Sequence, residues 1–226
     1  MQALQDPPSL VLPPSLYLGP CPLVSYKPFL RRNSITHVLS IGANPSRLAK
    51  LDSVTYHRLS LSDSSSASIL KIIDAALEII DGAIASKEGT GKILVHCLAG
   101  ISRSPTVVAA YLMKRKGMSL KAAFGQIVRV RPQISPNTGF IRQLKEMEIQ
   151  LYGSCSLEVD EFPKREKDRL ALFEEPKEQP NEQSKKQSKV QSQVQSDEQS
   201  KEQPNERSNE QSESASVEMG IATPST

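Results

Sequence analysis

The sequence predicts an α/β fold, with a central, mostly parallel sheet of about five short strands flanked by helices and a disordered C-terminal tail. The folded part is predicted because short aliphatic and β-branched runs alternate with longer stretches that are apolar at the helical period. The tail is predicted because Gln, Ser, Glu, Lys, Asn and Pro dominate the chain after about residue 163, and no aromatic residue follows Phe173. Such a segment cannot bury enough apolar area to offset the entropy lost on ordering.

Five short segments are predicted strands, because they are apolar or β-branched and several of them are bounded by Gly or Pro. The first two flank a Pro-Pro pair, which places them near an edge of the sheet. Continuous apolar strands separated by helices indicate a sheet that is covered on both faces. The predicted strands are residues 10–12, 16–18, 37–41, 55–59 and 93–95.

Four longer segments are predicted helices. Residues 68–85 carry apolar side chains in a wide stripe at the helical period. Residues 103–116 are apolar nearly all round, which predicts a helix in the middle of the domain. Ser119 is a predicted N-cap of a helix that ends before Pro132, and a last helix covers residues 137–151.

Composition divides the 226 residues into a flexible N-terminus (1–8), one folded domain (9–152) and the tail (153–226). Residues 1–152 contain 18 Lys and Arg against 9 Asp and Glu, whereas residues 153–226 contain 10 against 16. A basic domain suits an anionic substrate. Nucleic acid is not favoured, because the basic residues are scattered and aromatic residues are only 4% of the chain. The tail is a candidate binding segment for an unknown partner.

The three cysteines, Cys21, Cys97 and Cys155, lack the spacing of a metal site, and their odd number argues against a disulfide framework. The first residues do not resemble a signal peptide, and no apolar run is long enough for a membrane span. We therefore expect no metal, no cofactor and no membrane partner, in a reducing compartment that is the cytoplasm or the nucleus.

One octapeptide, His96 to Arg103, followed by Ser104, carries the chemistry. A cysteine and an arginine separated by five mostly small residues, between a strand and a helix, are typical of a loop whose N–H groups point at one anion. The arginine offers a planar fork that matches two phosphate oxygens. Cys97, at the positive end of the helix dipole, is then expected to be a thiolate at neutral pH. A lone cysteine is often only a small buried apolar residue, but the joint pattern favours catalysis.

The neighbouring residues have expected roles in the same loop. Ser104 is placed to donate a hydrogen bond to Cys97, and His96 to brace the loop through its ring nitrogens. The predicted phosphate-binding residues are Leu98, Ala99, Gly100, Ile101, Ser102 and Arg103.

The run resembles the signature of the cysteine-based protein phosphatases. Its residues 97–104 are similar to the dual-specificity branch, which includes the MAP-kinase phosphatases. Further matching runs extend the resemblance over about residues 9–152; they are residues 16–19, 36–39, 110–113, 135–137, 139–140 and 143–144. The resemblance implies the fold of these phosphatases and a two-step mechanism without a metal. Cys97 attacks phosphorus, water hydrolyses the phosphocysteine, and Arg103 with the loop N–H groups stabilises the equatorial oxygens.

The resemblance also implies an aspartate that protonates the leaving oxygen, located after the strand that precedes the long helix. The matching residue is Asp63, for which an ordinary loop or capping role is the alternative; Asp52 and Asp81 fit this position less well. Asn137 resembles a family asparagine that supports the phosphate loop, and it is equally a candidate N-cap of the last helix.

The predicted activity is hydrolysis of phosphotyrosine and phosphoserine/threonine in proteins, with protein kinases as one candidate class of substrate. The uncharged loop positions Leu98, Ala99, Ile101 and Ser102 favour a phosphoprotein over a phosphoinositide. The alternatives are a phosphate-binding module without turnover, or a phosphatase of an RNA end, a glycan or a lipid.

Four other residues keep two interpretations each. Arg129 and Arg131 either contact a second acidic group on a substrate or form a solvated surface. Cys21 and Cys155 are either ordinary thiols or partners that trap oxidised Cys97 as a disulfide.

Overall fold

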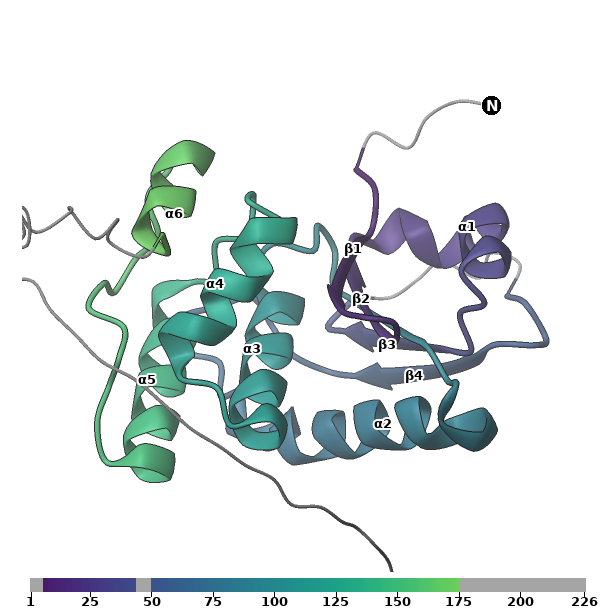
Figure 1. Cartoon of the computed structure of the whole chain (residues 1–226), viewed down its shortest axis with the longest axis horizontal. Helices are drawn as coiled ribbons and strands as arrows, with labels where there is room; N and C mark the ends of the chain where they lie inside the picture. Colours follow the sequence, from purple (N-terminus) through teal and green to yellow (C-terminus); the bar gives the residue numbers. More distant parts are fainter. Residues whose placement is uncertain (1–5, 44–49, 175–226) are drawn as a thin grey trace, which may run out of the picture. The chain divides into compact units, whose positions relative to one another are not determined.

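Among residues 6–43 and 50–174, which the computed structural model describes, five strands form one sheet in the order β1-β2-β5-β3-β4 (Figure 1). Only the pairing of β1 with β2 is antiparallel in this sheet. The mostly parallel sheet is therefore confirmed, and every predicted strand lies within one residue of its observed bounds. The strands are β1 (Ser9–Leu12), β2 (Leu16–Gly19), β3 (His37–Ile41), β4 (Thr55–Leu59) and β5 (Ile93–His96).

Both faces of the sheet are buried, and the alternation of side chains along each strand divides them between two cores. Leu39 and Val95 belong to the larger core, which includes residues of the four long helices. Val38 and Leu94, one residue away on the same strands, belong to a smaller core on the other face. This explains why the strands read as continuous apolar runs rather than as alternating ones.

The four predicted helices are confirmed. They are α2 (Leu70–Gly89), α3 (Arg103–Lys116), α4 (Leu120–Val130) and α5 (Thr138–Tyr152). Every residue of α3 from Arg103 to Met113 is buried, as its all-round apolar character predicts. In α2 the backbone leaves helical geometry at Ser86, Lys87 and Glu88, so the regular helix ends near the predicted boundary at residue 85.

The smaller core is covered by two short helices that the sequence analysis did not predict, η1 (Cys21–Ser25) and α1 (Lys27–Arg32). Each has a proline in its first turn, where the missing N–H costs little. Neither is long enough to show a helical period, which is why only the tertiary structure identifies them.

The prediction that the tail begins at residue 153 is wrong for residues 153–174. This segment contains α6 (Glu166–Leu172) and places Phe162 and Phe173 against Phe124 of α4, with ring centroids 5.0 and 6.5 Å from the Phe124 ring. Leu157 and the two aromatic rings are buried in the larger core, and Val159, Leu170 and Leu172 of the same segment pack against it. The remaining predicted tail, residues 175–226, lies outside the described residues.

The N-terminus also needs a correction. Residues 1–5 of the predicted flexible segment lie outside the described part, but Asp6 and Pro7 are held by hydrogen bonds from Arg131.

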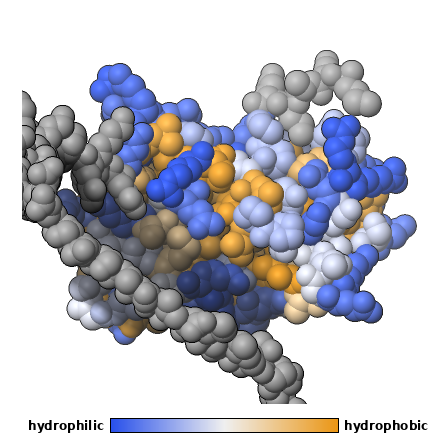
Figure 2. All heavy atoms as spheres, in the orientation of Figure 1, coloured by the Kyte–Doolittle hydropathy of each residue, from blue (hydrophilic) through white to orange (hydrophobic). Residues whose placement is uncertain are grey.

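Figure 2 shows hydrophobic residues across the middle of one face and hydrophilic residues along its rim. No helix of the described segments combines the length and apolarity needed to cross a bilayer.

The docking of residues 153–174 predicts the effect of a core substitution. Phe162→Ala removes a ring that is only 3% exposed, so we expect it to lower the free energy of unfolding by about 3 to 5 kcal/mol. Ile149→Ala, at a half-exposed position of α5, is the control and should cost less than about 1 kcal/mol. Urea unfolding followed by circular dichroism measures both. Equal, small effects would mean that the segment contributes little to the fold.

Candidate active site

The candidate site lies at the carboxyl ends of the parallel strands, where loops from neighbouring strands meet. Strand β5 lies between β2 and β3 in the sheet and leads into residues 97–102, after which α3 begins. Gly42 follows β3 and Asp63 follows β4 at the same edge. The parallel topology therefore brings together groups that are far apart in the chain.

In the loop from Cys97 to Ile101, each of the five backbone carbonyls accepts a hydrogen bond from a residue outside these five. Two donors are backbone N–H groups, one is the His96 ring, and the Arg131 guanidinium supplies the other two. The pairs are Cys97 O with His96 Nδ1 (3.0 Å), Leu98 O with Cys21 N (3.0 Å), Ala99 O with Arg131 Nη2 (3.1 Å), Gly100 O with Arg131 Nε (2.8 Å) and Ile101 O with Ser135 N (2.9 Å).

These outward bonds determine where the loop's N–H groups point. In a planar trans peptide the C=O of one residue and the N–H of the next point in opposite directions. Carbonyls held outward therefore direct the following N–H groups inward, and the N–H of Gly100 donates to Cys97 Sγ at 3.2 Å. Converging N–H groups are the arrangement that binds anions in other loops, and the sequence predicts such a loop at this position.

The thiol of Cys97 is buried at the floor of this ring. Burial acts to raise its pKa, but the Ser104 hydroxyl, at 3.3 Å, and the backbone N–H groups of Ser104, Gly100 and Ile101 donate to the sulfur and outweigh burial. The net pKa of Cys97 is lowered from its ordinary value. A lowered pKa favours the thiolate, which is the reactive form of cysteine.

His96 braces the loop from the end of β5, where it is fully buried. Burial lowers its pKa, and the nearby Arg103 charge lowers it further, against a raising contribution from its bond to the Cys97 carbonyl. A carbonyl only accepts, so Nδ1 carries the hydrogen. In the neutral ring Nε2 then accepts from the Ser40 hydroxyl at 2.6 Å. Ser40 on β3 is a contributor that the sequence analysis missed.

Arg103 opens α3 and points its guanidinium into the site, with the side chain 11% exposed. Its Nε is buried and makes no hydrogen bond with any described residue, although it lies 3.5 Å from Asp63 Oδ2. A side chain at position 42 would strike Arg103 Nη1 and the Leu61 carbonyl, and Gly42 has a positive φ of 62°. Gly42 therefore leaves the room that the guanidinium occupies.

Asp63 lies at the rim, held by the side chains around it. Its Oδ1 accepts from Ser102 Oγ at 2.7 Å and from Asn137 Nδ2 at 2.9 Å, and its Oδ2 faces Arg103. Of the two rival aspartates, Asp81 pairs with Arg115 on the outside of the domain, and neither Asp52 nor Asp81 lines the pocket around Cys97.

Asn137 connects the acid, the loop and the last helix. Its Oδ1 accepts from the N–H of Phe140 and caps α5, while its own N–H donates to Ser102 Oγ at 3.2 Å. The helix cap and the contact with the loop, which the sequence leaves as alternatives, are thus present together.

A pocket of about 360 Å³ joins these groups. It is open to one side, and Leu98 on its rim is 65% exposed. Its lining residues are Asp63, Cys97, Leu98, Ala99, Ile101, Ser102, Arg103, Ser135 and Asn137. Nucleophile, cation and carboxyl therefore face one space.

The glycine of the motif is required by close packing. Gly100 has a positive φ of 68°, and a Cβ at this position would lie 2.6 Å from the Gly19 backbone and 2.9 Å from Arg131 Nη2. Arg131 itself lies behind the loop with its side chain fully buried, so neither of its predicted surface roles applies. Arg129 is directed to the Phe173 carbonyl at 3.5 Å.

The other cysteines are free thiols. Cys21 is partly buried beside the loop, where burial and the nearby charge of Cys97 raise its pKa. Cys155 is exposed and directs its thiol to the Leu157 carbonyl. Among the described residues no group of three or more His, Cys, Asp or Glu side chains is arranged to hold a metal ion.

Comparison with known proteins agrees with this geometry. The family model described as "Dual specificity phosphatase, catalytic domain" matches residues 16–150. The chain is 40% identical over 139 residues to dual specificity protein phosphatase 1 of Arabidopsis thaliana, an alignment that covers 62% of this chain and 68% of that protein. It is also 40% identical over 141 residues to human dual specificity protein phosphatase 5, where the alignment covers 62% of this chain but only 36% of the relative.

The fold matches solved structures as well. The crystal structure of DUSP15 superposes with a TM-score of 0.57 at 33% identity, and covers 76% of this chain and 98% of that one. Since the family match includes strand β5, the loop that begins at Cys97 and the helices around it, the chain belongs to the dual specificity phosphatase family.

Proposed function

We propose that this protein is a phosphoprotein phosphatase that hydrolyses phosphotyrosine and phosphoserine/threonine through a phosphocysteine intermediate. The observation that carries the proposal is the position of Cys97 Sγ beneath inward N–H groups, with Arg103 and Asp63 lining the same pocket. A module that only bound phosphate would need the loop and the arginine, but not a lowered thiol pKa or a carboxyl at the rim.

In the first step the Cys97 thiolate attacks phosphorus. A sulfur–phosphorus bond forms while the bond from phosphorus to the substrate oxygen breaks. Asp63 carries a proton in this step and gives it to the leaving oxygen, because a serine or threonine alkoxide is a poor leaving group. Arg103 Nε, which makes no hydrogen bond with a described residue, and the loop N–H groups stabilise the negative charge on the other phosphate oxygens.

In the second step a water molecule attacks the phosphocysteine. Asp63, now a carboxylate, takes a proton from that water, and the sulfur–phosphorus bond breaks to release inorganic phosphate and the thiolate. The donors that lower the Cys97 pKa also make the sulfur a better leaving group here.

The pocket favours a phosphorylated side chain on a protein. Among the described residues that line it, Arg103 is the only basic one, and Leu98, Ala99 and Ile101 offer apolar contacts. A highly charged inositide head group would need further cations inside the loop. The open side of the pocket suits both the short phosphoserine and the long phosphotyrosine.

We also propose action in the cytoplasm or the nucleus, on phosphorylated proteins that include protein kinases. A thiolate nucleophile with a second thiol, Cys21, close to its loop needs a reducing environment to stay active.

Replacement of the nucleophile tests turnover against binding. We expect Cys97→Ser to lose measurable hydrolysis of p-nitrophenyl phosphate and of matched phosphotyrosine and phosphothreonine peptides, and to keep peptide binding in calorimetry. Cys155→Ser, at an exposed thiol, is the control and should keep full activity. A wild-type protein that binds these peptides without hydrolysing them would be a binding module. Hydrolysis confined to RNA ends, glycans or lipids would show a different substrate.

The role of Asp63 predicts a difference between substrates. Asp63→Ala should lower kcat for a phosphothreonine peptide by about 10²- to 10⁴-fold. The fall should be much smaller for an aryl phosphate, whose leaving group needs no proton. Asp81→Ala removes a carboxylate outside the pocket and serves as the control. Equal losses on both substrates would assign the acid to another residue.

The hydrogen bond from Ser104 predicts a change in the pH dependence of alkylation. Because the Cys97 pKa is lowered, the thiolate forms at a lower pH than in an ordinary cysteine and remains the main form at every higher pH. Ser104→Ala removes a donor, raises that pKa and should shift the midpoint of iodoacetamide alkylation to higher pH. Ser86→Ala, whose hydroxyl bonds only within α2, is the control. An unchanged midpoint in Ser104→Ala would contradict the assignment.

A further inference from the structure

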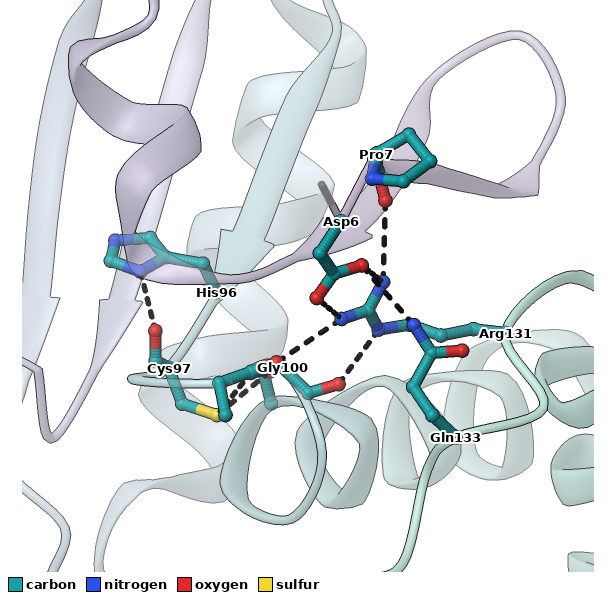
Figure 3. A network of polar contacts seen from close by, with 9 residues as sticks. Asp6, Pro7, His96, Cys97, Gly100, Arg131 and Gln133 are labelled. Atoms are coloured by element: carbon teal, nitrogen blue, oxygen red, sulfur yellow. Dashed lines mark hydrogen bonds and ion pairs between the residues drawn. The ribbon is translucent and has the colours of Figure 1, made fainter. Parts of the chain in front are cut away.

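Behind the phosphate loop, the buried Arg131 guanidinium forms an ion pair with the partly exposed Asp6 carboxylate (Figure 3). The Arg131 side chain is fully buried, and the Asp6 carboxylate accepts from Nη1 at 2.8 Å and from Nη2 at 2.7 Å. Gln133 adds a third bond to the same carboxylate at 3.1 Å. A guanidinium buried to this extent is unfavourable unless it is paired, so Asp6 is the group that makes the position of Arg131 tenable.

All five N–H donors of Arg131 have partners. Two are directed to the Asp6 carboxylate, a third contacts the Pro7 carbonyl at 3.3 Å, and the last two bond the Ala99 and Gly100 carbonyls of the loop. The planar fork is thus fixed on one side by the N-terminal segment, and it fixes the loop on the other.

The two loop carbonyls that Arg131 holds are those whose peptides point N–H groups at the sulfur. Ala99 O belongs to the peptide that carries the N–H of Gly100, which donates to Cys97 Sγ at 3.2 Å. Gly100 O belongs to the peptide that carries the N–H of Ile101, another donor to that thiolate. Rotation of either peptide would turn a donor away from Sγ and bring a carbonyl toward it.

We infer that Asp6 is a positioning residue for the phosphate-binding loop, which acts through Arg131 to keep the Gly100 and Ile101 N–H groups directed at Cys97. Asp6 lies outside residues 16–150, which match the family model, and its contact spans 125 positions of sequence. The N-terminal segment is thereby part of the catalytic apparatus. This inference rests on the proposed function only where turnover is concerned, because the direction of the N–H groups also sets the reactivity of the thiol.

The segment of residues 153–174 also holds the chain next to Arg131. Arg169 in α6 is buried and donates from Nε to the Pro132 carbonyl at 2.6 Å, directly after Arg131 in the chain. Arg169 also donates to the carbonyls of Pro163 and Lys164, so its guanidinium links Pro132 to the segment just before α6. With Pro132 held in this way, the partners outside the loop that orient the Arg131 fork are the Asp6 carboxylate, with two bonds, and the Pro7 carbonyl, with one longer bond.

The test compares Asp6→Asn with Asp6→Glu. Asn keeps the shape but loses the charge and one acceptor, so it cannot bind both nitrogens of the fork. We expect Asp6→Asn to shift the midpoint of iodoacetamide alkylation of Cys97 to higher pH and to lower kcat/KM for p-nitrophenyl phosphate about 10-fold. Asp6→Glu keeps the carboxylate at a partly exposed position and should recover most of both properties.

Two further variants make the result specific. Arg131→Lys keeps the charge but cannot span both carbonyls, so it should shift the alkylation midpoint in the same direction as Asp6→Asn. Asp74→Asn removes the same charge from an exposed pair with Lys114 and should leave both properties unchanged. Urea unfolding of each variant identifies the conditions under which that variant is folded. The alkylation midpoint and kcat/KM are measured under those conditions.

The outcomes separate the two proposals. A wild-type alkylation midpoint in folded Asp6→Asn would overturn the inference, even if the variant were less stable, because a merely structural ion pair would lower stability without moving that midpoint. A wild-type protein without phosphatase activity would overturn the proposed function instead. The alkylation comparison needs no turnover and would still decide the role of Asp6.

Discussion

The site depends on one constraint: hydrogen bonds hold the five consecutive carbonyls of residues 97–101 pointing outward from the loop. A loop of small residues has no intrinsic reason to direct its N–H groups to one point, and those groups repel one another when they converge. The bonds from His96, Cys21, Arg131 and Ser135 hold the peptides in this orientation. The lowered pKa of Cys97 follows from this arrangement, because the converging donors outweigh burial.

The parallel sheet makes these bonds available. Because β2, β5 and β3 end at the same edge, the turn after β2 supplies Cys21, the turn after β3 supplies Gly42, and β3 itself supplies Ser40 behind His96. The helices supply the remainder: α3 carries Arg103, and the segment between α4 and α5 carries Arg131 and Ser135. Cys97 and Arg103 come from the loop and the first turn of the helix that follows it, whereas the groups that orient them come from the whole domain.

The strands, the four long helices and the loop were predictable because their signals are local. Apolar periodicity, a capping Ser119 and the cysteine-to-arginine spacing each lie within one short window of sequence. Helix α6 and the docking of Phe162 and Phe173 were not predictable in this way, because a polar segment with few apolar residues resembles a disordered one until its partner surface on α4 is known. The same holds for η1 and α1, which are shorter than the window that reveals a helical period.

By itself, the sequence determined the class of fold and predicted Cys97 and Arg103 as site residues from their local spacing, and the family resemblance pointed to Asp63 as the candidate acid. Only the tertiary structure decided which groups hold these residues in place. Asp6 and Arg131 are 125 positions apart, and no periodicity or spacing relates them. Their pairing arises because a buried guanidinium needs a carboxylate, and the fold places the N-terminal segment where that need exists.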